Sequence, residues 1–333
     1  MTDWPWPAGS ATGIGSLPGT DIAEAQRIVL GELPTFPHLA ELPGRGAGAD
    51  MIGRGAGFLV DLPVQVYAGG WVMTSRPGKD QRRTADLLER DLDTLTEQAD
   101  GFTGPFKIQA TGPWTLAAGV DLAIGGRLLR DPGAVRDLTD SLAEGLRRHV
   151  ADLRYRLPGA TIVLQLDEPS LPAVLAGHVP TESGFSAYRA VAAADAATAL
   201  RTVVQAVDAP VVVHCCAADV PLQVVRDAGA VGVALDLSLV QDLDPLGEAI
   251  ESGLGLLAGA VATTASSGGR APSSATIAER VRTLWHRLSF PAGRLPQQVV
   301  LTPACGLAGA SLPYARAVLA ACQDAARRLT EPG

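Results

Sequence analysis

A histidine and two cysteines offer the clearest chemistry in this sequence. His214 and Cys216 stand two residues apart at the end of an apolar run, so their side chains share one face if the run is a strand. Cys305 follows another apolar run, far along the chain. Imidazole and thiolate are ligands that zinc prefers, and a catalytic zinc ion (Zn2+) takes three protein ligands and keeps one position open. These residues predict a zinc site, against the competing interpretation that free cysteines only fill a core.

Other polar residues also follow apolar runs. Gly15 and Ser16 end the first run, Asp167 and Glu168 close another, and Asp236 stands at the end of a third. If the runs are strands of one barrel, their carboxyl ends meet around a single axial site. Asp236 could then add an oxygen ligand to the nitrogen and the two sulfurs.

Eight apolar runs alternate with longer helical patterns, in which Asp131-Pro132 and Ser311-Leu312-Pro313 are typical helix starts. The later runs are rich in Val, Leu and Ala, as in strands buried on both faces of a parallel sheet. The alternation predicts an α/β protein with a (β/α)8 TIM barrel, one domain over residues 1–333, and leaves an open doubly wound sheet as the alternative. The expected strands are Thr12–Leu17, Phe58–Val66, Phe106–Thr111, Thr161–Asp167, Val211–Cys216, Gly232–Leu237, Leu254–Ala260 and Val299–Pro303.

Composition excludes several classes of protein. Hydrophobic residues make up 47% of the 333, charged residues 19%, and the net charge is −8, so we expect a large core and no nucleic-acid or anionic-membrane surface. We find neither a run of 18 apolar residues nor a signal-peptide pattern, and therefore expect a cytoplasmic protein. Disulfides are not expected there, and Cys215 should face away from Cys216.

The segment Gly44–Gly48 recurs as Gly53–Gly57, with the sequence Gly-Arg-Gly-Ala-Gly in both. It lacks the Lys-Ser/Thr of a P-loop and does not join a strand to a helix in the manner of a dinucleotide fingerprint. We interpret it as a mobile loop over the mouth of the barrel, in which Arg45 and Arg54 could contact an anion.

Five segments, in order, resemble the catalytic C-terminal barrel of cobalamin-independent methionine synthase and its short archaeal-type relatives. They span nearly the whole chain, and the His-x-Cys, Asp-Glu-Pro and Pro-x-Cys-Gly-Leu patterns are specific as a set. The segments are Thr12–Pro18, Thr111–Leu116, Gln165–Leu171, His214–Cys216 and Thr302–Leu307.

The resemblance implies a zinc enzyme that methylates the thiol of homocysteine to form methionine. The family holds zinc by His, Cys, Glu and Cys, which match His214, Cys216, Asp236 and Cys305, with an acid shorter by one methylene at position 236. No catalytic side chain beyond the metal-activated thiol is implied. The positions that match the family's substrate contacts are Ile14, Gly15, Ser16, Glu41 and Asp167.

The methyl donor is where the sequence departs from this family. Folate-using members carry a histidine in an Asp-x-His-Ser-Pro stretch, and the equivalent Val261–Arg270 has neither His nor acid. The short relatives are associated with a methyl-corrinoid donor, so the resemblance favours a methyl-corrinoid, or a protein that delivers one, over methyltetrahydrofolate. A barrel enzyme with another thiol acceptor or decarboxylase-like chemistry, as in uroporphyrinogen decarboxylase, and a non-catalytic thiol-amino-acid binder remain alternatives.

Overall fold

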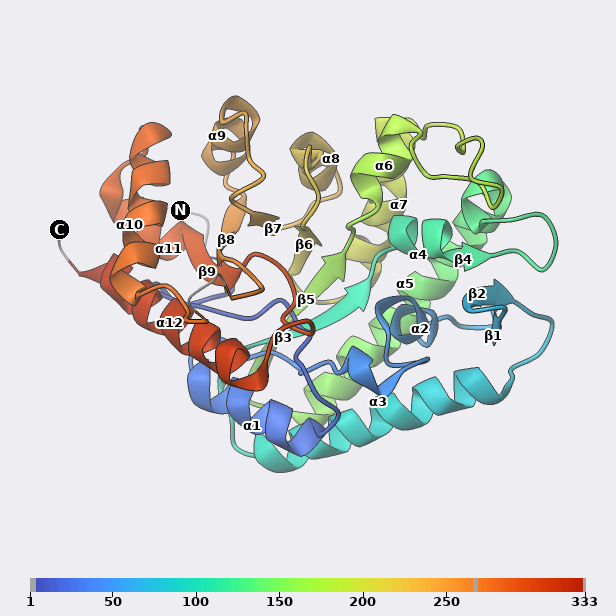
Figure 1. Cartoon of the computed structure of the whole chain (residues 1–333), viewed down its shortest axis with the longest axis horizontal. Coiled ribbons are helices and arrows are strands. Elements are labelled where there is room, and N and C mark those ends of the chain that lie inside the picture. The colour runs from blue at the N-terminus through green and yellow to red at the C-terminus, as the bar shows by residue number, and fades with distance from the viewer. Residues whose placement is uncertain (1–3, 266–268, 332–333) are drawn as a thin grey trace.

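The computed structural model describes residues 4–265 and 269–331. Its centre is a curled sheet of six parallel strands in the order β3-β5-β6-β7-β8-β9, and helices surround it (Figure 1). The strands are β3 (Gly104–Thr111), β5 (Ala160–Asp167), β6 (Val211–Cys215), β7 (Gly232–Asp236), β8 (Gly255–Val261) and β9 (Val299–Pro303). They confirm six of the eight expected strands to within two residues at each end.

The two expected helix starts at Asp131 and Ser311 are confirmed. Asp131 accepts hydrogen bonds from the backbone at the start of α5, and Ser311 does so for α12. The helices are α1 (Ile22–Glu32), α2 (Met51–Ala56), α3 (Lys79–Gln98), α4 (Pro113–Gly119), α5 (Pro132–Arg156), α6 (Leu171–Ala176), α7 (Ala193–Ala206), α8 (Leu222–Asp227), α9 (Asp244–Glu251), α10 (Ser274–Arg287), α11 (Leu295–Gln298) and α12 (Leu312–Thr330).

The second expected strand is wrong, and the first is present only as isolated bridges. Residues 10–17 and 38–41 form only isolated parallel bridges, Ala11 to Leu301 of β9, Ser16 to Glu41, and His38 to Lys107 of β3. These bridges lie between the two edge strands of the six-stranded sheet.

Phe58–Val66, expected as the second strand, is mostly irregular. Pro63 lacks the backbone N–H that a central strand would donate, and Asp61 has a φ of +58°. Only its end enters β1 (Val64–Tyr67), which belongs to a separate sheet with β2 (Gly70–Met73) and β4 (Val120–Asp121).

Side chains alternate along each strand of the curled sheet, and this alternation positions the site. Outward residues such as Leu164 and Val213 pack under the helices in two large apolar clusters. The inner face is apolar near the start of the strands, where Val163, Val212 and Leu257 pack with Trp6 and Phe36. The rings of Trp6 and Phe36 stack with centroids 6.2 Å apart. The residues of the cluster and Asp167 therefore lie beyond this apolar layer, toward the carboxyl ends of the strands.

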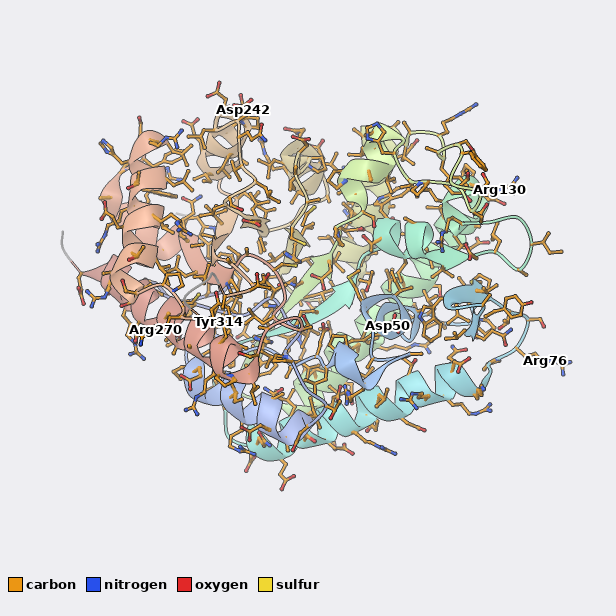
Figure 2. All side chains as sticks on the ribbon, in the orientation of Figure 1. Asp50, Arg76, Arg130, Asp242, Arg270 and Tyr314 are labelled. Atoms are coloured by element: carbon orange, nitrogen blue, oxygen red, sulfur yellow. The ribbon has the colours of Figure 1, made fainter. Side chains whose placement is uncertain are left out.

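Charged side chains lie on the outer surface. The labelled charged side chains Arg76, Arg130 and Asp242 lie at the periphery in Figure 2, and all three are exposed. Among the described residues, no helix combines the length and the hydropathy needed to cross a membrane.

Candidate metal centre

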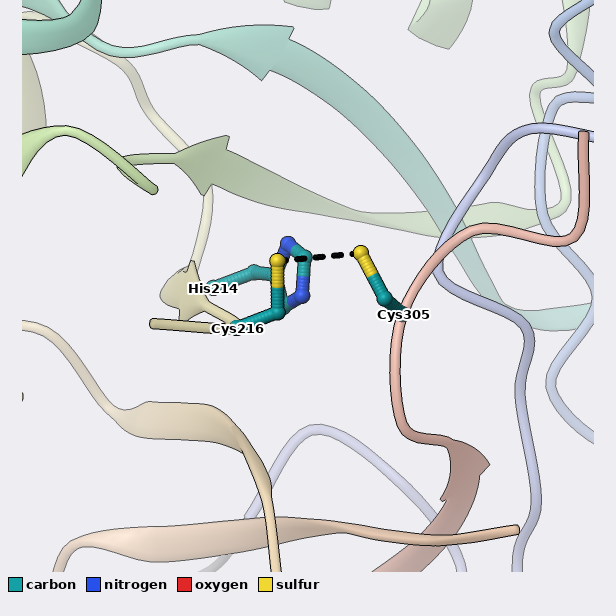
Figure 3. A group of neighbouring side chains, drawn as sticks. All are labelled: His214, Cys216 and Cys305. Carbon is teal, nitrogen blue, oxygen red and sulfur yellow. Dashed lines mark hydrogen bonds between the residues drawn. The ribbon is translucent and has the colours of Figure 1, made fainter. Parts of the chain in front are cut away.

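His214, Cys216 and Cys305 meet at the carboxyl end of the sheet. His214 is the penultimate residue of β6, Cys216 directly follows β6, and Cys305 lies two residues after β9. One ligand atom from each falls within 4.8 Å of the others, and the two sulfurs are 3.0 Å apart. Figure 3 shows the three side chains converging from two separate strands. The parallel sheet thus brings together residues that are 89 positions apart.

Asp167 orients the histidine of this cluster. Its Oδ1 lies 2.9 Å from Nδ1 of His214, and within residues 4–265 and 269–331 the buried Nε2 of His214 has no hydrogen-bond partner. A carboxylate on the far nitrogen is how proteins commonly fix a metal-ligating imidazole. The orphaned Nε2 and two thiols suit zinc, which binds nitrogen and sulfur in this combination.

The charges of the metal-free cluster favour proton loss from sulfur. Burial lowers the pKa of His214, but the hydrogen bond and charge of Asp167 outweigh it and raise that pKa to about 9. Contact with Cys216 lowers the pKa of Cys305 to about 5 against the opposing effect of burial, and His214 contributes to that decrease. The same sulfur contact raises the pKa of Cys216. Of the two sulfurs, Cys305 therefore loses its proton more easily than Cys216.

Asp236, the expected fourth ligand, ends β7 outside this group of three. Its Oδ1 accepts hydrogen bonds from the backbone N–H and the hydroxyl of Ser238, at 2.9 and 2.6 Å. It still lines a cavity of about 1030 Å³ together with Cys216 and Cys305. Direct ligation by Asp236 stays a prediction.

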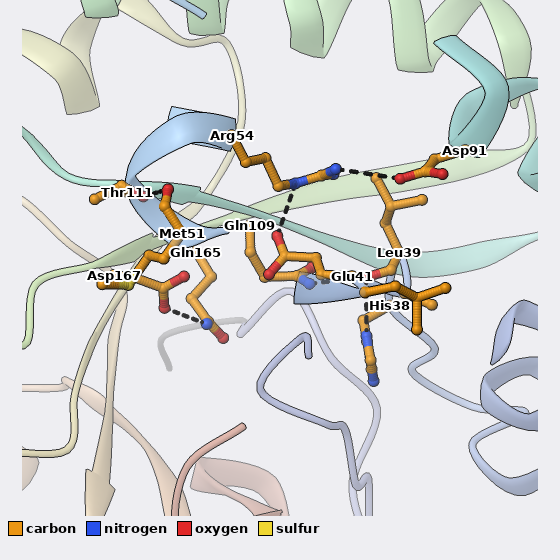
Figure 4. A network of polar contacts seen from close by, with 12 residues as sticks. His38, Leu39, Glu41, Met51, Arg54, Asp91, Gln109, Thr111, Gln165 and Asp167 are labelled. Atoms are coloured by element: carbon orange, nitrogen blue, oxygen red, sulfur yellow. Dashed lines mark hydrogen bonds and ion pairs between the residues drawn. The ribbon is translucent and has the colours of Figure 1, made fainter. Parts of the chain in front are cut away.

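A second polar group lies around Glu41, on the irregular segment beside β3. Its Oε1 forms an ion pair of 3.0 Å with Nε of Arg54, and Arg54 in turn contacts Asp91 of α3 (Figure 4). Burial raises the pKa of Glu41 to about 7, with Arg54 opposing and Asp167 adding to the shift. Glu41 and Asp167 keep 15% and 12% of their side chains exposed, so both can accept a cation from a ligand.

The expected mobile loop is instead ordered structure. Residues 43–45 form a 3-10 turn, and α2 begins after Asp50, whose side chain accepts a hydrogen bond from Gly53. Arg45 and Arg54 both point to buried Asp91 rather than to a free anion site. The acid that holds both arginines is remote in sequence, so the repeat alone could not reveal it.

Residues 14–16 connect the two polar groups. A side chain on Gly15 would come within 2.5 Å of Nε2 of Gln109 and 3.1 Å of Glu41, so only glycine fits there. Ser16 lies on the other side, against Gly306, and its carbonyl accepts the N–H of Leu307. The segment therefore passes between the carboxylate of Glu41 and the chain that carries Cys305.

Two neighbouring carboxylates of the Asp-Glu-Pro motif have different surroundings. Glu168 points outward and accepts hydrogen bonds from the backbone of Trp114 and Thr115 at the start of α4, and from the Thr115 hydroxyl. Burial raises its pKa to about 7, against those three hydrogen bonds. Glu168 thus holds a helix in place, whereas Asp167 faces the site.

The sequence did not reveal the buried Lys107 and Gln165, which lie beside Asp167. Lys107 donates to Gln165, and Gln165 donates to Asp167. Side chains alternate between the two faces of a strand. Lys107 and Gln165 alternate with apolar residues that face outward, so this alternation could have placed both on the inner face. The structure describes only part of Val261–Arg270, the segment that bears on the methyl donor, because 266–268 lie outside the described residues.

Comparisons with known proteins agree with this geometry. Over 97% of its length, and 98% of the other chain, the structure is similar to a B12-independent methionine synthase from a Shewanella species in complex with selenomethionine, with 13% identity and a TM-score of 0.62. It is also similar to a methyltransferase from Methanosarcina mazei, with 15% identity, 96% and 95% coverage and a TM-score of 0.55. These likenesses support the fold.

The sequence gives the family. No curated protein sequence matches the chain. Residues 103–328, which include Asp167 and all three residues of the cluster, match the model of the catalytic domain of cobalamin-independent synthase. The chain therefore belongs to the cobalamin-independent methionine synthase family, a family of methyltransferases.

Proposed function

We propose that this protein is a zinc-dependent methyltransferase of methionine biosynthesis, which methylates the thiol of homocysteine. The observation that carries the proposal is the meeting of His214, Cys216 and Cys305, with Asp167 on the far nitrogen of the histidine. A zinc ion held there would remove the proton of an incoming thiol and keep the sulfur ready for attack. Three protein ligands leave a position for that sulfur.

The amino-acid end of homocysteine would lie between the carboxylates of Glu41 and Asp167. Both side chains are partly exposed, and each already has a cation or a donor on its other side. Each carboxylate can therefore accept an ammonium group while it keeps its present partner, Arg54 for Glu41 and Gln165 for Asp167. Ile14, Gly15 and Ser16 would hold the substrate from the segment that links this pocket to Cys305, and the selenomethionine bound to the similar Shewanella enzyme is a ligand of the same class.

Binding at both ends would orient the thiol, and orientation contributes much of the acceleration in a displacement reaction. The polar groups lie at the carboxyl end of a core whose other end is filled by Trp6 and Phe36. We propose that residues 10–17 and 38–41 complete an eight-stranded barrel around this core, in one catalytic domain over 1–333.

A methyl-corrinoid is the proposed donor. Val261–Arg270 lacks the histidine of folate-using relatives, and the cavity of about 1030 Å³ beside Cys216 and Cys305 extends to Thr263 and Arg280. A cavity of this size exceeds what a homocysteine side chain fills. We therefore expect the donor to enter from the side of β8 and α10.

The test is a methyl-transfer assay with homocysteine, run in parallel with methylcobalamin and methyltetrahydrofolate, on protein whose zinc content has been measured. We expect about one zinc per chain and methionine formation with methylcobalamin. Activity only with the folate would overturn the proposed donor. The absence of zinc, together with full activity of His214→Ala, would overturn the proposed function.

A further inference from the structure

We infer that Lys107 and Gln165 form a buried clamp that holds the Ile14 segment and the metal-binding face of His214 in a fixed arrangement. Lys107 and Gln165 are positioning residues in this inference, because neither touches the cluster itself. The inference rests on the proposed metal site and adds residues to it that the family comparison does not assign.

The contacts form one continuous path. Nζ of Lys107 donates to the carbonyl of Ile14 at 3.1 Å and to Oε1 of Gln165 at 2.7 Å. Nε2 of Gln165 donates to the same carbonyl at 2.8 Å and to Oδ1 of Asp167 at 2.7 Å. Oδ1 of Asp167 also lies 2.9 Å from Nδ1 of His214. Residues from β3, β5 and β6 are thereby tied to the segment before Gly15.

The polarity of this path is fixed at the lysine. An ammonium group has donors and no acceptor, so the oxygen of the Gln165 amide must face Lys107. The NH2 of that amide must then face Asp167. A flipped amide would set two donors against each other at Lys107 and two acceptors against each other at Asp167.

The same reasoning reaches the imidazole. The carboxylate of Asp167 only accepts hydrogen bonds, so Nδ1 of His214 must carry a proton to donate to it. In the neutral ring Nε2 then has the free lone pair, and this buried atom has no hydrogen-bond partner among the described residues. The lysine thus fixes, over two intervening side chains, the hydrogen bonds that hold the carboxylate of Asp167 against Nδ1, which leaves Nε2 available to a metal.

Burying Lys107 and Gln165 costs folding free energy unless their polar atoms are paired. Lys107 and Gln165 are both 0% exposed, and a buried ammonium needs nearby negative charge. Burial lowers the pKa of Lys107 to about 7, while Asp167 and Glu41 oppose that decrease. The lysine therefore also supplies a counter-charge to the two carboxylates proposed to bind the ammonium of homocysteine.

The test uses Lys107→Gln, Lys107→Met and Gln165→Leu in the full chain. Lys107→Gln is the milder change, because it keeps a polar group but lets the amide of residue 165 adopt either orientation. Gln298→Leu is the matched control: Gln298 is equally buried and donates to the carbonyls of Ile250 and Leu254, away from the site.

Two measurements decide the outcome. Zinc affinity is measured by competition with a chelator. The tautomer of His214 is measured in metal-free protein at a pH above 9, where the ring is neutral, from long-range nitrogen–proton spectra, which five histidines keep tractable. We expect about tenfold weaker zinc binding, the lower end of the range for outer partners of metal ligands, and a mixed tautomer. The control should lose stability alone.

Unchanged zinc affinity and an unchanged tautomer in folded Lys107→Gln would overturn the clamp and leave the proposed function intact. If the wild-type chain binds no zinc, the proposed function fails, and the tautomer measurement alone still decides the inference. If Lys107→Met does not fold, Lys107→Gln and Gln165→Leu carry the test.

Discussion

The sulfur cluster, which is His214, Cys216 and Cys305, lies beside the acidic pocket of Glu41 and Asp167. Different features hold the two in place. The cluster takes its residues from the ends of two regular strands, since His214 lies in β6, Cys216 directly follows it, and Cys305 follows β9 by two residues. The pocket takes Glu41 from a segment with isolated bridges only, and it depends on ion pairs to Arg54 and on the Lys107–Gln165 clamp. Backbone register therefore positions the metal ligands, whereas side-chain charges position the amino-acid contacts.

The largest effect should follow from removing a ligand of the cluster. We expect Cys305→Ala to bind little zinc and to lose methyl transfer to background, because two protein ligands hold zinc poorly. Metal analysis and the methionine assay check this. Cys215→Ala is the control, since Cys215 is buried on the opposite face of β6; equal zinc loss in both variants would contradict the assignment.

Asp167→Asn should have the next largest effect, because Asp167 belongs to both regions. We expect zinc affinity to fall 10- to 100-fold, as for other outer partners of ligating histidines, together with weaker methionine binding. Chelator competition and calorimetry measure the two effects. Loss of methionine binding with wild-type zinc affinity would place Asp167 in the pocket alone.

Glu168→Gln should lower the stability of the protein and leave zinc affinity unchanged, unlike Asp167→Asn. Its carboxylate accepts two backbone N–H groups at the start of α4, and an amide would turn an N–H toward one of them. We expect a loss of about 2 kcal/mol in the free energy of unfolding, with zinc affinity unchanged. Denaturant unfolding and chelator competition separate the two results, and a large zinc effect would show that the neighbouring acids are not independent.

Methionine binding should depend on pH through Glu41. With a pKa raised to about 7 by burial, the carboxylate fraction grows about tenfold between pH 6 and pH 8. Methionine keeps its ammonium over this range, so its affinity should rise by up to about tenfold. Loss of charge on Lys107, whose pKa is lowered to about 7, acts in the same direction. A profile for Glu41→Gln as steep as for the wild type would exclude Glu41 as the cause.

The smallest effect is expected at Asp236. If it is a weak or water-bridged ligand, Asp236→Ala should weaken zinc binding by less than about tenfold, and Asp236→Glu should strengthen it because the longer acid reaches further. Chelator competition on both variants checks this. A loss as large as that of Cys305→Ala would make Asp236 a full member of the cluster.

The regular part of the fold was predictable and the irregular part was not. β5 to β9 are continuous apolar runs, which sheet burial on both faces imposes, and their ends located His214, Cys216 and Cys305. The place of the second strand is taken instead by residues around Glu41, whose only pairing is long-range. No local pattern encodes such bridges, because they depend on the edges of a sheet formed elsewhere.

The candidate site shows the same division. The motif around Asp167 indicated function, and Asp167 does face the site. Its hydrogen bond to His214, however, joins residues that are 47 positions apart in the sequence. Asp91, which anchors Arg54, is equally remote. Short motifs identified which residues matter, and the folded sheet determined how they are paired.

The stacked Trp6 and Phe36 have a kinetic consequence. With the amino-terminal end of the interior filled, homocysteine and the methyl donor would use the same mouth. The deeper ligand would have to arrive first and its methylated form leave last, so turnover would follow a compulsory order. Excess donor would then trap the enzyme before the acceptor binds, and initial-rate patterns would show substrate inhibition by the donor alone.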